Sequence, residues 1–340
     1  MTGSPYPLKT ERLTLRFPRP EDEGVITAYR NDHEVAALQD WRLPYDEQRA
    51  RYLVARHEGM TDLEAGGHHQ VMVVHDGEVV GDLYVGIDEH GGVAEIGFTL
   101  ARSAQGRGIA FEAASAVVDD LVERLGMHRI AAELAPENVA SARLLERLGM
   151  TYESQTERST WVRGQWLDSL RYGMSAEGWR AWRDRVRTAP DDVRLVEITD
   201  DNFRTWTWMD PHRSQQPFVA TVEESFVDAL FPGTRYGVPL VPEYRGIEAD
   251  GVPAGFIMWS EATPDPYLWR FLVDRRHQGR GIGRRAFGLW AQLMRDHEHT
   301  EAETSWVQAP GGPEAFHLSC GWVPTGAYED GEALARLRLA

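Results

Sequence analysis

The chain of 340 residues has few cysteines and no long apolar runs. Its one cysteine, Cys320, cannot form a disulfide within the chain, which is typical of a reducing compartment. Cys320 lies at a predicted helix end, where a small buried side chain is a commoner role than a nucleophile. No apolar run approaches the ~20 residues that cross a bilayer, and the N-terminus lacks the layout of a signal peptide. We expect a soluble, cytoplasmic protein without a membrane partner.

Positive charge is also scarce. The chain has 36 Lys and Arg against 53 Asp and Glu, which gives a formal net charge of -17. An acidic surface repels nucleic acid, so none is expected as a partner. The acidity either concentrates a cationic substrate near the protein or only keeps the protein in solution. His68 and His69, and likewise His297 and His299, do not share a face of their elements, so no metal site is predicted.

One short stretch occurs twice. Residues 94–111 read AEIGFTLARSAQGRGIAF, and residues 268–287 read LWRFLVDRRHQGRGIGRRAF. Each joins an apolar strand pattern to a basic turn with spaced glycines and then to a helix pattern. Such a turn leaves backbone amides at the helix start without partners, and glycine lets an anion approach them. Both turns are therefore predicted to hold a pyrophosphate, through Gln105, Gly106, Arg107, Gly108, Ile109 and Ala110 in the first copy and Gln278, Gly279, Arg280, Gly281, Ile282 and Gly283 in the second.

Two common phosphate loops fit these turns poorly. The dinucleotide fingerprint GxGxxG needs a third glycine where Phe111 stands, and a Walker A loop needs a lysine that neither copy has. Both copies instead resemble the Q/R-x-x-G-x-G/A acyl-CoA loop of the GNAT N-acetyltransferase superfamily. The resemblance implies that each half binds acetyl-CoA or a related acyl-CoA. The strand residues before each loop are then expected on the cofactor as well: Phe98, Thr99 and Leu100, and Phe271, Leu272 and Val273. A solvated turn that binds nothing is the alternative for each copy.

The repeat predicts two domains, since its copies lie about half a chain apart. We expect an N-terminal domain over residues 1–186, a linker over 187–192 and a C-terminal domain over 193–340. Strands and helices of the first half follow the order β-α-α-β-β-β-α-β-α-β-β, and the second half repeats it. The predicted fold class is α/β (α+β), with two GNAT domains in tandem, each a mixed and mostly antiparallel sheet flanked by helices.

Several strands have well-marked limits in the sequence. Strands are predicted over residues 78–87, 151–162, 252–260 and 267–273, each bounded by turn residues. The stretch 236–242 is rich in proline and less regular. In the last part of the chain, one strand is predicted, over residues 333–339.

The first half resembles the RimJ/RimL branch of the GNAT superfamily. The likeness rests on TERLTLR at 10–16, AEIGF at 94–98 and PENVASARLLERLGM at 136–150. It implies that Asn138 and Ser141 lie beside the pantetheine arm and the acyl thioester. Members of this branch acylate protein N-termini, aminoglycosides and other small amines.

Acyl transfer to an amine needs few side chains. A protonated amine must lose a proton before it attacks, and the departing thiolate needs a proton or a hydrogen bond. Glu95 is the candidate base, and the alternative is a carboxylate that only pairs with an arginine. Ser141 is the candidate donor to the thiolate, and the alternative is a helix-start hydroxyl that bonds a backbone amide. Leu145 occupies the position where many GNAT enzymes have a tyrosine acid.

The second half resembles the branch with diamine and polyamine acetyltransferases, through WRFLVDRRHQGRGIGRRA and FHLSCGWVPTG. The asparagine position falls on Pro310 or Gly312, and neither has a side-chain donor. The tyrosine position is His317, which either protonates a thiolate or has no role. Leu268 aligns with Glu95, so a base must come from elsewhere, and Glu261 is the candidate.

These residues predict an N-acetyltransferase that moves an acetyl group from acetyl-CoA to a primary amine by direct attack on the thioester. The expected partner is a small-molecule amine: a metabolite, an antibiotic or a polyamine-like compound. Two alternatives stay open, namely a protein N-terminal or lysine acetyltransferase and a CoA-binding pair in which one or both domains are inactive. The N-terminal half has the more complete set of matched residues, so we expect an active site there first.

Overall fold

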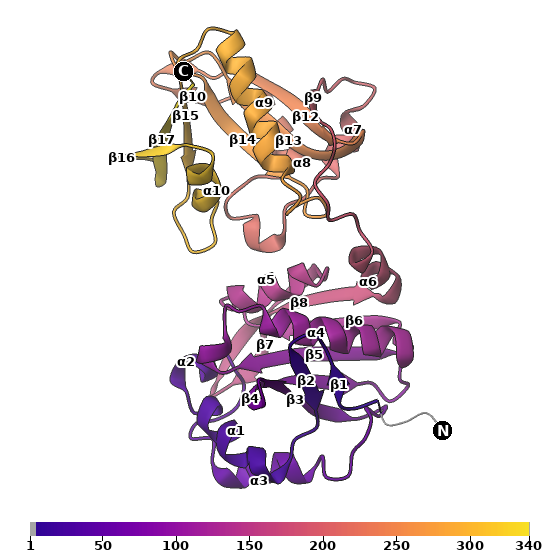
Figure 1. Ribbon diagram of the computed structural model, residues 1–340. Helices are drawn as coiled ribbons and strands as arrows, with labels where there is room; N and C mark the ends of the chain where they lie inside the picture. The colour runs from indigo at the N-terminus through magenta and orange to yellow at the C-terminus, as the bar shows by residue number, and fades with distance from the viewer. Residues whose placement is uncertain (1–4, 340) are drawn as a thin grey trace. The chain divides into compact units, whose positions relative to one another are not determined.

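The computed structural model of the chain describes residues 5–339. The chain forms two compact units, Met1–Arg185 and Val186–Ala340. Each unit has one large sheet with helices packed against it (Figure 1). Among residues 5–339, no helix is both long enough and apolar enough to cross a membrane.

The N-terminal unit is built on one eight-stranded sheet. Its strands are β1 (Leu8–Lys9), β2 (Leu13–Arg16), β3 (His68–His75), β4 (Glu78–Ile87), β5 (Val93–Leu100), β6 (Arg129–Leu134), β7 (Thr151–Val162) and β8 (Gln165–Ser175). They lie in the order β1-β2-β3-β4-β5-β6-β8-β7. All neighbours are antiparallel except β5 and β6, which are parallel.

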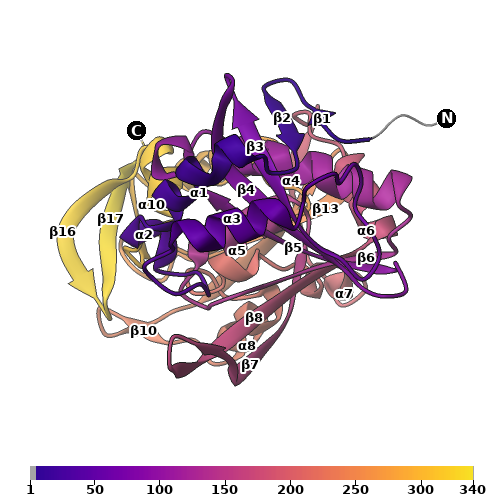
Figure 2. The ribbon, with the colours of Figure 1, turned by 90° about the horizontal axis from the view of Figure 1, so that it is seen from below.

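Helices cover both faces of this sheet. They are α1 (Glu23–Arg30), α2 (His33–Ala36), α3 (Glu47–Ala55), α4 (Ile109–Asp119), α5 (Val139–Arg147) and α6 (Ala176–Arg183), with 3-10 turns at Pro20–Asp22 (η1) and Arg102–Ala104 (η2) and a π-helical turn at Asp120–Arg124 (η3). α1 and α3 share a core with Met72 of β3, whereas α4, α5 and α6 share the larger core with Val71 and Val73. Because neighbouring residues of a strand face opposite ways, the two cores lie on opposite faces. Figure 2 shows α1 and α3 in front of the strands.

The C-terminal unit repeats this plan. Its strands are β9 (Val193–Val196), β10 (Thr234–Arg235), β11 (Val238–Pro239), β12 (Pro242–Ala249), β13 (Val252–Ser260), β14 (Tyr267–Val273), β15 (Glu301–Trp306), β16 (Val323–Glu329) and β17 (Glu332–Arg338). Seven form a sheet in the order β16-β17-β15-β14-β13-β12-β9, with β14 and β15 parallel, and β10 and β11 form a separate hairpin.

The helices of the C-terminal unit also lie on two faces. They are α7 (Phe203–Thr207), α8 (Val222–Leu230), α9 (Ile282–Asp296) and α10 (Glu314–Ser319), with a 3-10 turn, η4, at Arg213–Gln215. α9 packs on Ile257 and Trp259 of β13, whereas α7 and α8 pack on Phe256 and Met258. This alternation along β13 separates the two cores in the same way as in the N-terminal unit.

The structure confirms the predicted fold class, two mixed and mostly antiparallel sheets flanked by helices. The predicted limits of β4, β7, β13 and β14 match the structure. β16 was missed because Pro324 and Gly326 read as turn residues within an otherwise exposed strand. The irregular stretch 236–242 holds part of the β10–β11 hairpin.

Candidate active site

The two glycine loops take the same backbone conformation in both units. Gly106 and Gly108 have φ angles of 70° and 77°, and Gly279 and Gly281 have φ angles of 77° and 78°. A residue with a Cβ would be strained at these left-handed angles, which explains why glycine occupies these positions. The expected turn is therefore present in each copy.

Each loop opens a helix that no side chain caps. Gly108 is the N-cap of α4 and Gly281 is the N-cap of α9, and neither position makes a side-chain capping hydrogen bond. A Cβ built on Gly106, Gly279 or Gly281 would meet no heavy atom within 4 Å. Uncapped amides below open space fit a bound anion such as a pyrophosphate.

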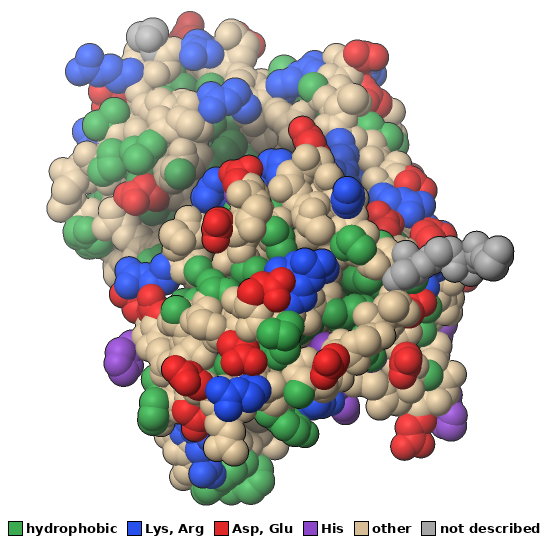
Figure 3. Space-filling view, turned by 60° about the horizontal axis from the view of Figure 1, so that its bottom comes forward, with side chains coloured by type: hydrophobic (Ala, Val, Ile, Leu, Met, Phe, Trp, Pro, Cys, Tyr) green, Lys and Arg blue, Asp and Glu red, His purple; other side chains and the backbone are tan. Residues whose placement is uncertain are grey.

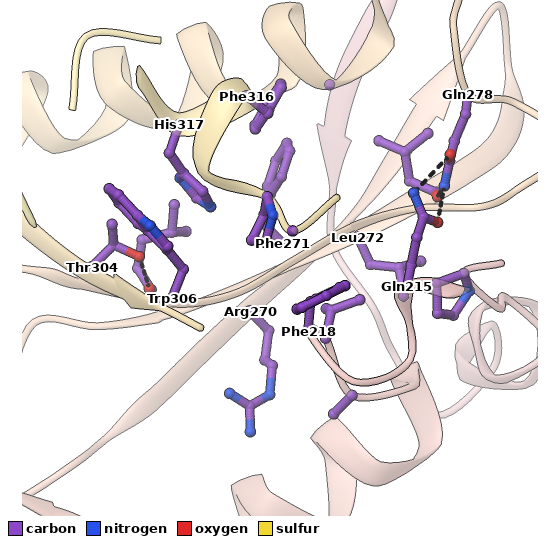
Figure 4. Close-up of a pocket in the computed structure, with 18 of the residues that line it drawn as sticks. Gln215, Phe218, Arg270, Phe271, Leu272, Gln278, Thr304, Trp306, Phe316 and His317 are labelled. Atoms are coloured by element: carbon purple, nitrogen blue, oxygen red, sulfur yellow. Dashed lines mark hydrogen bonds between the residues drawn. The ribbon is translucent and has the colours of Figure 1, made fainter. Parts of the chain in front are cut away.

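A glutamine side chain ties each loop to the strand before it. Gln105 Nε2 donates to the carbonyl oxygen of Leu100 at 3.0 Å, and Gln278 Nε2 donates to that of Val273 at 2.9 Å. Gln278 also exchanges hydrogen bonds of 2.8 and 3.2 Å with Gln215 (Figure 4). The glutamine that begins each motif thus holds the loop in shape.

The loop arginines differ between the units. Arg107 is exposed, and its carbonyl oxygen accepts a hydrogen bond from Arg12 Nη1 at 3.2 Å. Arg280 is only 9% exposed, and its Nε donates to the carbonyl oxygen of Thr188 at 2.9 Å. The guanidinium of Arg280 also lies 3.7 Å from the Asp250 carboxylate. The Arg280 side chain therefore fastens the segment before β9, and only its backbone amide belongs to the loop.

Both sheets open beside the loops. β5 pairs with β6 only at Val93, Ala94 and Glu95, and β14 pairs with β15 only at Tyr267 and Leu268. The rest of β5 and β14, residues 96–100 and 269–273, has no ladder partner on that side. Apart from the Leu100 and Val273 carbonyls, which bond the loop glutamines, backbone groups along the free edge therefore remain available to a ligand.

The opening in the C-terminal unit is a pocket of about 930 Å³. It runs from Gly279 and Gly281 along β14 to Thr304 and Trp306 of β15, and Phe218 lies on its other wall (Figure 4). The expected cofactor residues that line it are Phe271, Leu272, Val273, Gln278, Gly279, Gly281, Ile282 and Gly283. The volume is within the range of pockets that enclose organic ligands.

His317 of α10 also lines this pocket. Its ring stacks on Trp306, with centroids 4.9 Å apart and planes 6° from parallel, and Figure 4 shows it between Phe316 and Trp306. Burial lowers the pKa of His317 to about 4. Its Nδ1 has no hydrogen-bond partner among residues 5–339. The ring is neutral near pH 7 and can exchange one hydrogen bond with a ligand.

Glu95 stands at the last paired position of β5, opposite Ala131 of β6 and Gly86 of β4. Its side chain is exposed, yet the surrounding walls desolvate it enough to raise its pKa, and the nearby Glu133 raises the pKa further. Within the described part of the chain, Glu95 makes no ion pair, but Arg171 lies near enough to lower its pKa, so a carboxylate that serves an arginine stays the alternative. A carboxylate with a raised pKa can accept a proton from an amine.

The start of α5 follows the end of β6, on the side of the opening. Asn138 is the N-cap, and its Oδ1 accepts a hydrogen bond from the Ser141 amide at 3.1 Å. The cap is therefore Asn138, and the Ser141 hydroxyl does not serve as one. Leu145, one turn farther along, is 1% exposed and lies in the core, so it takes no part in the opening.

One residue assigned to the C-terminal site, Glu261, lies elsewhere. Glu261 is not among the residues that line the pocket. Its carboxylate accepts hydrogen bonds from Trp259 Nε1 and bonds His297 and His299 at 2.9 to 3.2 Å. Burial alone would raise the pKa of Glu261, but these bonds outweigh it and lower the pKa. Glu261 thus holds the end of β13 in place, and the structure gives it no access to the opening.

A β-bulge changes the direction of Leu268. Met258 pairs with Arg270, and Trp259 pairs with Leu268, so Trp269 is an extra residue in β14. Leu268 consequently faces the α9 core, whereas Glu95 faces the α1–α3 side. Leu268 and Glu95 therefore occupy matching positions on their strands, but their side chains point to opposite faces of their sheets.

Two groups of pocket residues had no recognisable signal in the sequence. Trp306 and Phe218 line the C-terminal pocket but read as ordinary apolar residues of a strand and a loop. In the N-terminal unit, Tyr84 stands beside Glu95 and reads as a strand aromatic. A period-2 reading of β4 that placed Tyr84 on the same face as Gly86 could have found it.

The comparisons with known proteins agree in both units. Residues 12–151 match the acetyltransferase (GNAT) domain, and residues 195–335 match the acetyltransferase (GNAT) family. The chain is similar to the Uncharacterized N-acetyltransferase p20 of Bacillus licheniformis, with 30% identity over 168 residues that cover 49% of this chain and 94% of that protein. It is also similar to the [Ribosomal protein uS5]-alanine N-acetyltransferase of Escherichia coli, with 31% identity over 88 residues, 26% of this chain and 45% of that protein.

Among solved structures, a GNAT-family acetyltransferase from Bacillus anthracis is 26% identical. It covers 50% of this chain and 98% of its own, with a TM-score of 0.45. The resemblance of the C-terminal half to diamine and polyamine acetyltransferases stays a prediction. Two matched domains and a relative aligned over nearly its whole length identify this chain as a member of the GNAT acetyltransferase family, a tandem of two GNAT domains and an acyl-CoA-dependent N-acetyltransferase.

Proposed function

We propose that this protein transfers the acetyl group of acetyl-CoA to the primary amine of a small molecule, and that the N-terminal unit carries out the transfer. One observation carries the proposal. The sheet of that unit opens between β5 and β6 beside an uncapped glycine loop, and Glu95, a carboxylate with a raised pKa, stands where the opening begins. A binding site for the acyl donor and a base for the amine thus lie along one strand.

The residues present fit the cofactor in both units. The loop amides from Gly106 to Ala110, and from Gly279 to Gly283, would hold the pyrophosphate. The free edges of β5 and β14 would bond the pantetheine arm, through residues 98–100 and 271–273. The bound acetyl-CoA supplies an activated acetyl group as a thioester. We infer one cofactor for each unit, because both units have the loop and the opening.

The chain's own side chains then have three tasks. Glu95 accepts a proton from the acceptor amine, directly or through a water, so that the amine can attack. Ser141, at the start of α5, offers a hydrogen bond to the departing sulfur. The strand edge and the loop hold the reactants together, which can supply much of the acceleration. In the C-terminal unit, His317 is the available donor, and it donates as a neutral ring.

A small acceptor is supported by the size of the pocket that Tyr84, a neighbour of Glu95, helps to line. This pocket measures about 450 Å³ and lies under α3, between Trp41 and Tyr84. Pockets of this size suit single small molecules. The rival is a protein N-terminus, and the Escherichia coli relative that acetylates an alanine of ribosomal protein uS5 supports it. Initial rates with small primary amines and with peptides bearing a free N-terminus distinguish these two functions. An enzyme that acts on protein N-termini would acetylate longer peptides faster.

The cofactor sites are tested by titrating the full chain with acetyl-CoA in a calorimeter. We expect two sites in the wild type and one in each of the variants Gly108→Val and Gly281→Val. A branched side chain is strained at a φ near 77° and would occupy the space above the amides. Gly164→Val, at a hairpin with φ of 90° and open space, is the matched control and should keep both sites. Unchanged binding in both loop variants would exclude the loops as cofactor sites.

A further inference from the structure

The pocket under α3 lies near Glu95, since two of the residues that line it, His68 and Tyr84, interact electrostatically with the Glu95 carboxylate. Along β4 and β5, Tyr84 pairs with Gly97 and Gly86 pairs with Glu95, so Tyr84 and Glu95 share one face of the sheet. A Cβ on Gly86 would lie 2.5 Å from the Tyr84 hydroxyl, so this ring leans over Gly86, which pairs with Glu95 on one side and with His68 on the other. His68 Nδ1 bonds the same hydroxyl at 2.6 Å. Tyr84 is therefore the wall that the pocket shares with the surroundings of Glu95.

Arginine dominates the charge of this pocket. Arg42, Arg49 and Arg56 line it, and no Asp or Glu lines it within the described part of the chain. The hydrogen bonds of these arginines go to backbone carbonyls, from Arg49 Nη1 to Arg42 at 2.8 Å and from Arg56 Nη2 to His68 at 3.3 Å. None of the three forms an ion pair with a carboxylate of residues 5–339. None of the described residues that line the pocket supplies a carboxylate to balance these charges.

This arrangement is unusual for the chain. The formal net charge is -17, and acidic and basic side chains are interspersed on the face shown in Figure 3. Arg51, on the same helix α3, has a nearby carboxylate, since its Nε lies 3.7 Å from Glu23. A pocket with three arginines and no acid is thus a local feature and does not follow from the composition.

The remaining walls are aromatic. Trp41, Tyr45, Tyr52 and Tyr84 line the pocket. The guanidinium of Arg30 lies 4.8 Å from the Trp41 ring centroid and 5.0 Å from that of Tyr45, and Trp41 Nε1 donates to the Arg30 carbonyl oxygen at 3.0 Å. Arg30 is itself held by Asp82 at 2.9 Å. Two of the aromatic walls therefore rest on a buried ion pair, and flat rings of this kind stack on an organic body.

We propose that this pocket binds an acceptor that carries an anionic group, a carboxylate or a phosphate, on the same small molecule as the amine. Arginine forks bind both groups by paired hydrogen bonds. The anionic end would lie against Arg42, Arg49 and Arg56, the body against the aromatic walls, and the amine toward Glu95. The inference rests on the proposed function, since it takes Glu95 to mark the reaction centre.

Matched probes test the charge preference. The full chain with acetyl-CoA is given para-aminomethylbenzoate, para-aminomethylbenzamide or para-aminomethylphenylphosphonate, and the release of free CoA is followed. The three share one amine and one ring, so they differ mainly in the charge at the far end. We expect kcat/KM to be at least tenfold higher for the benzoate or the phosphonate than for the amide. Whichever of the two is preferred identifies the anion.

Two variants assign the preference to the arginines. The double variant Arg49→Gln with Arg56→Gln should remove the preference by raising KM for the anionic probe at least tenfold. Arg51→Gln removes the same charge from the same helix outside the pocket and should keep the preference. Both changes are on exposed positions, and Arg42→Gln in the preceding loop repeats the test if the double variant unfolds.

The two failures are distinguishable. Turnover of all three probes at equal rates, or faster turnover of the amide, would overturn the anionic acceptor and leave the proposed function intact. If no amine is acetylated, the proposed function fails. Calorimetric binding of para-aminomethylbenzoate to the three proteins then tests whether the pocket binds an anionic group. Binding that the double variant loses and Arg51→Gln keeps supports the anionic pocket, and equal binding by all three proteins overturns it.

Discussion

The glycine loops of the two units agree closely in geometry, whereas the side chains around the two openings differ. Gly108 and Gly281 have φ angles of 77° and 78°, and the anchoring glutamine bonds measure 3.0 and 2.9 Å. At the start of the openings the side chains differ, because Glu95 lies on the α1–α3 face of its sheet, whereas a bulge has turned the matching Leu268 into the α9 core. A phosphate is held by backbone amides, which need only glycines at the right positions. Proton transfer needs particular side chains, and these are not the same in the two halves.

The starts of the matching helices show the same contrast. Asn138 caps α5 with its side chain, whereas Pro313 at the N-cap of α10 makes no such bond. Four residues before the glycine that follows each helix, the N-terminal unit has the buried Leu145, and the C-terminal unit has His317 facing a pocket of about 930 Å³. Under the proposed function, each unit would therefore offer a different donor to the departing sulfur, Ser141 in one and a neutral histidine in the other.

Removal of the base should have the largest effect on this comparison. Glu95→Gln keeps the shape of the side chain but cannot accept a proton, so we expect kcat/KM to fall by roughly 10²–10⁴-fold. Acetyl-CoA affinity, measured by calorimetry, should stay unchanged. The control is Glu78→Gln, an exposed carboxylate at the first position of β4.

The same experiment can show that the roles of the two units are the reverse of those proposed. If Glu95→Gln retains full activity while Gly281→Val abolishes it, the chemistry lies in the C-terminal unit, and the N-terminal unit is the scaffold. The size of the C-terminal pocket makes that outcome worth measuring in the same preparation.

Loss of the proposed thiolate donor should have a smaller effect. Ser141→Ala is expected to lower kcat about 10- to 100-fold, since a hydrogen bond to a charged group contributes about 1.5–3 kcal/mol. The affinity for acetyl-CoA and the melting temperature should not change, because Asn138 and not Ser141 caps the helix. Asn138→Ala is the matched variant and should cost about 1 kcal/mol of stability. If Ser141→Ala instead lowers the affinity for acetyl-CoA and leaves kcat unchanged, Ser141 serves in binding and not as the thiolate donor.

Local features of the sites could be predicted from the sequence. The glycine spacing predicts the turns because left-handed φ angles are a property of single residues. The strand patterns of β4, β7, β13 and β14 predicted their limits, because alternation and flanking turn residues are local as well. The position of Glu95 beside the opening followed from its place on the strand before the loop.

Features that depend on pairing between strands could not be predicted in this way. The bulge at Trp269 reverses the direction of Leu268, and nothing in the sequence of β14 marks it. The basic pocket was also not predicted, since the sequence of residues 45–58 shows a helix with charged faces but not which side chains lie opposite Arg49 and Arg56. Only the tertiary structure shows that no carboxylate stands opposite them.

The smallest effect expected is a shift in pH dependence. Desolvation and then Glu133 raise the pKa of Glu95, so the acid limb of kcat/KM should lie above the usual range of a glutamate. Glu133→Gln removes the neighbouring negative charge, which makes ionisation of Glu95 easier and lowers its pKa. The base then stays ionised at lower pH, so the acid limb moves to lower pH by less than about one unit, with kcat at high pH unchanged. A limb that stays in place in Glu133→Gln but disappears in Glu95→Gln would mean that Glu95 is the base and that burial alone sets its pKa.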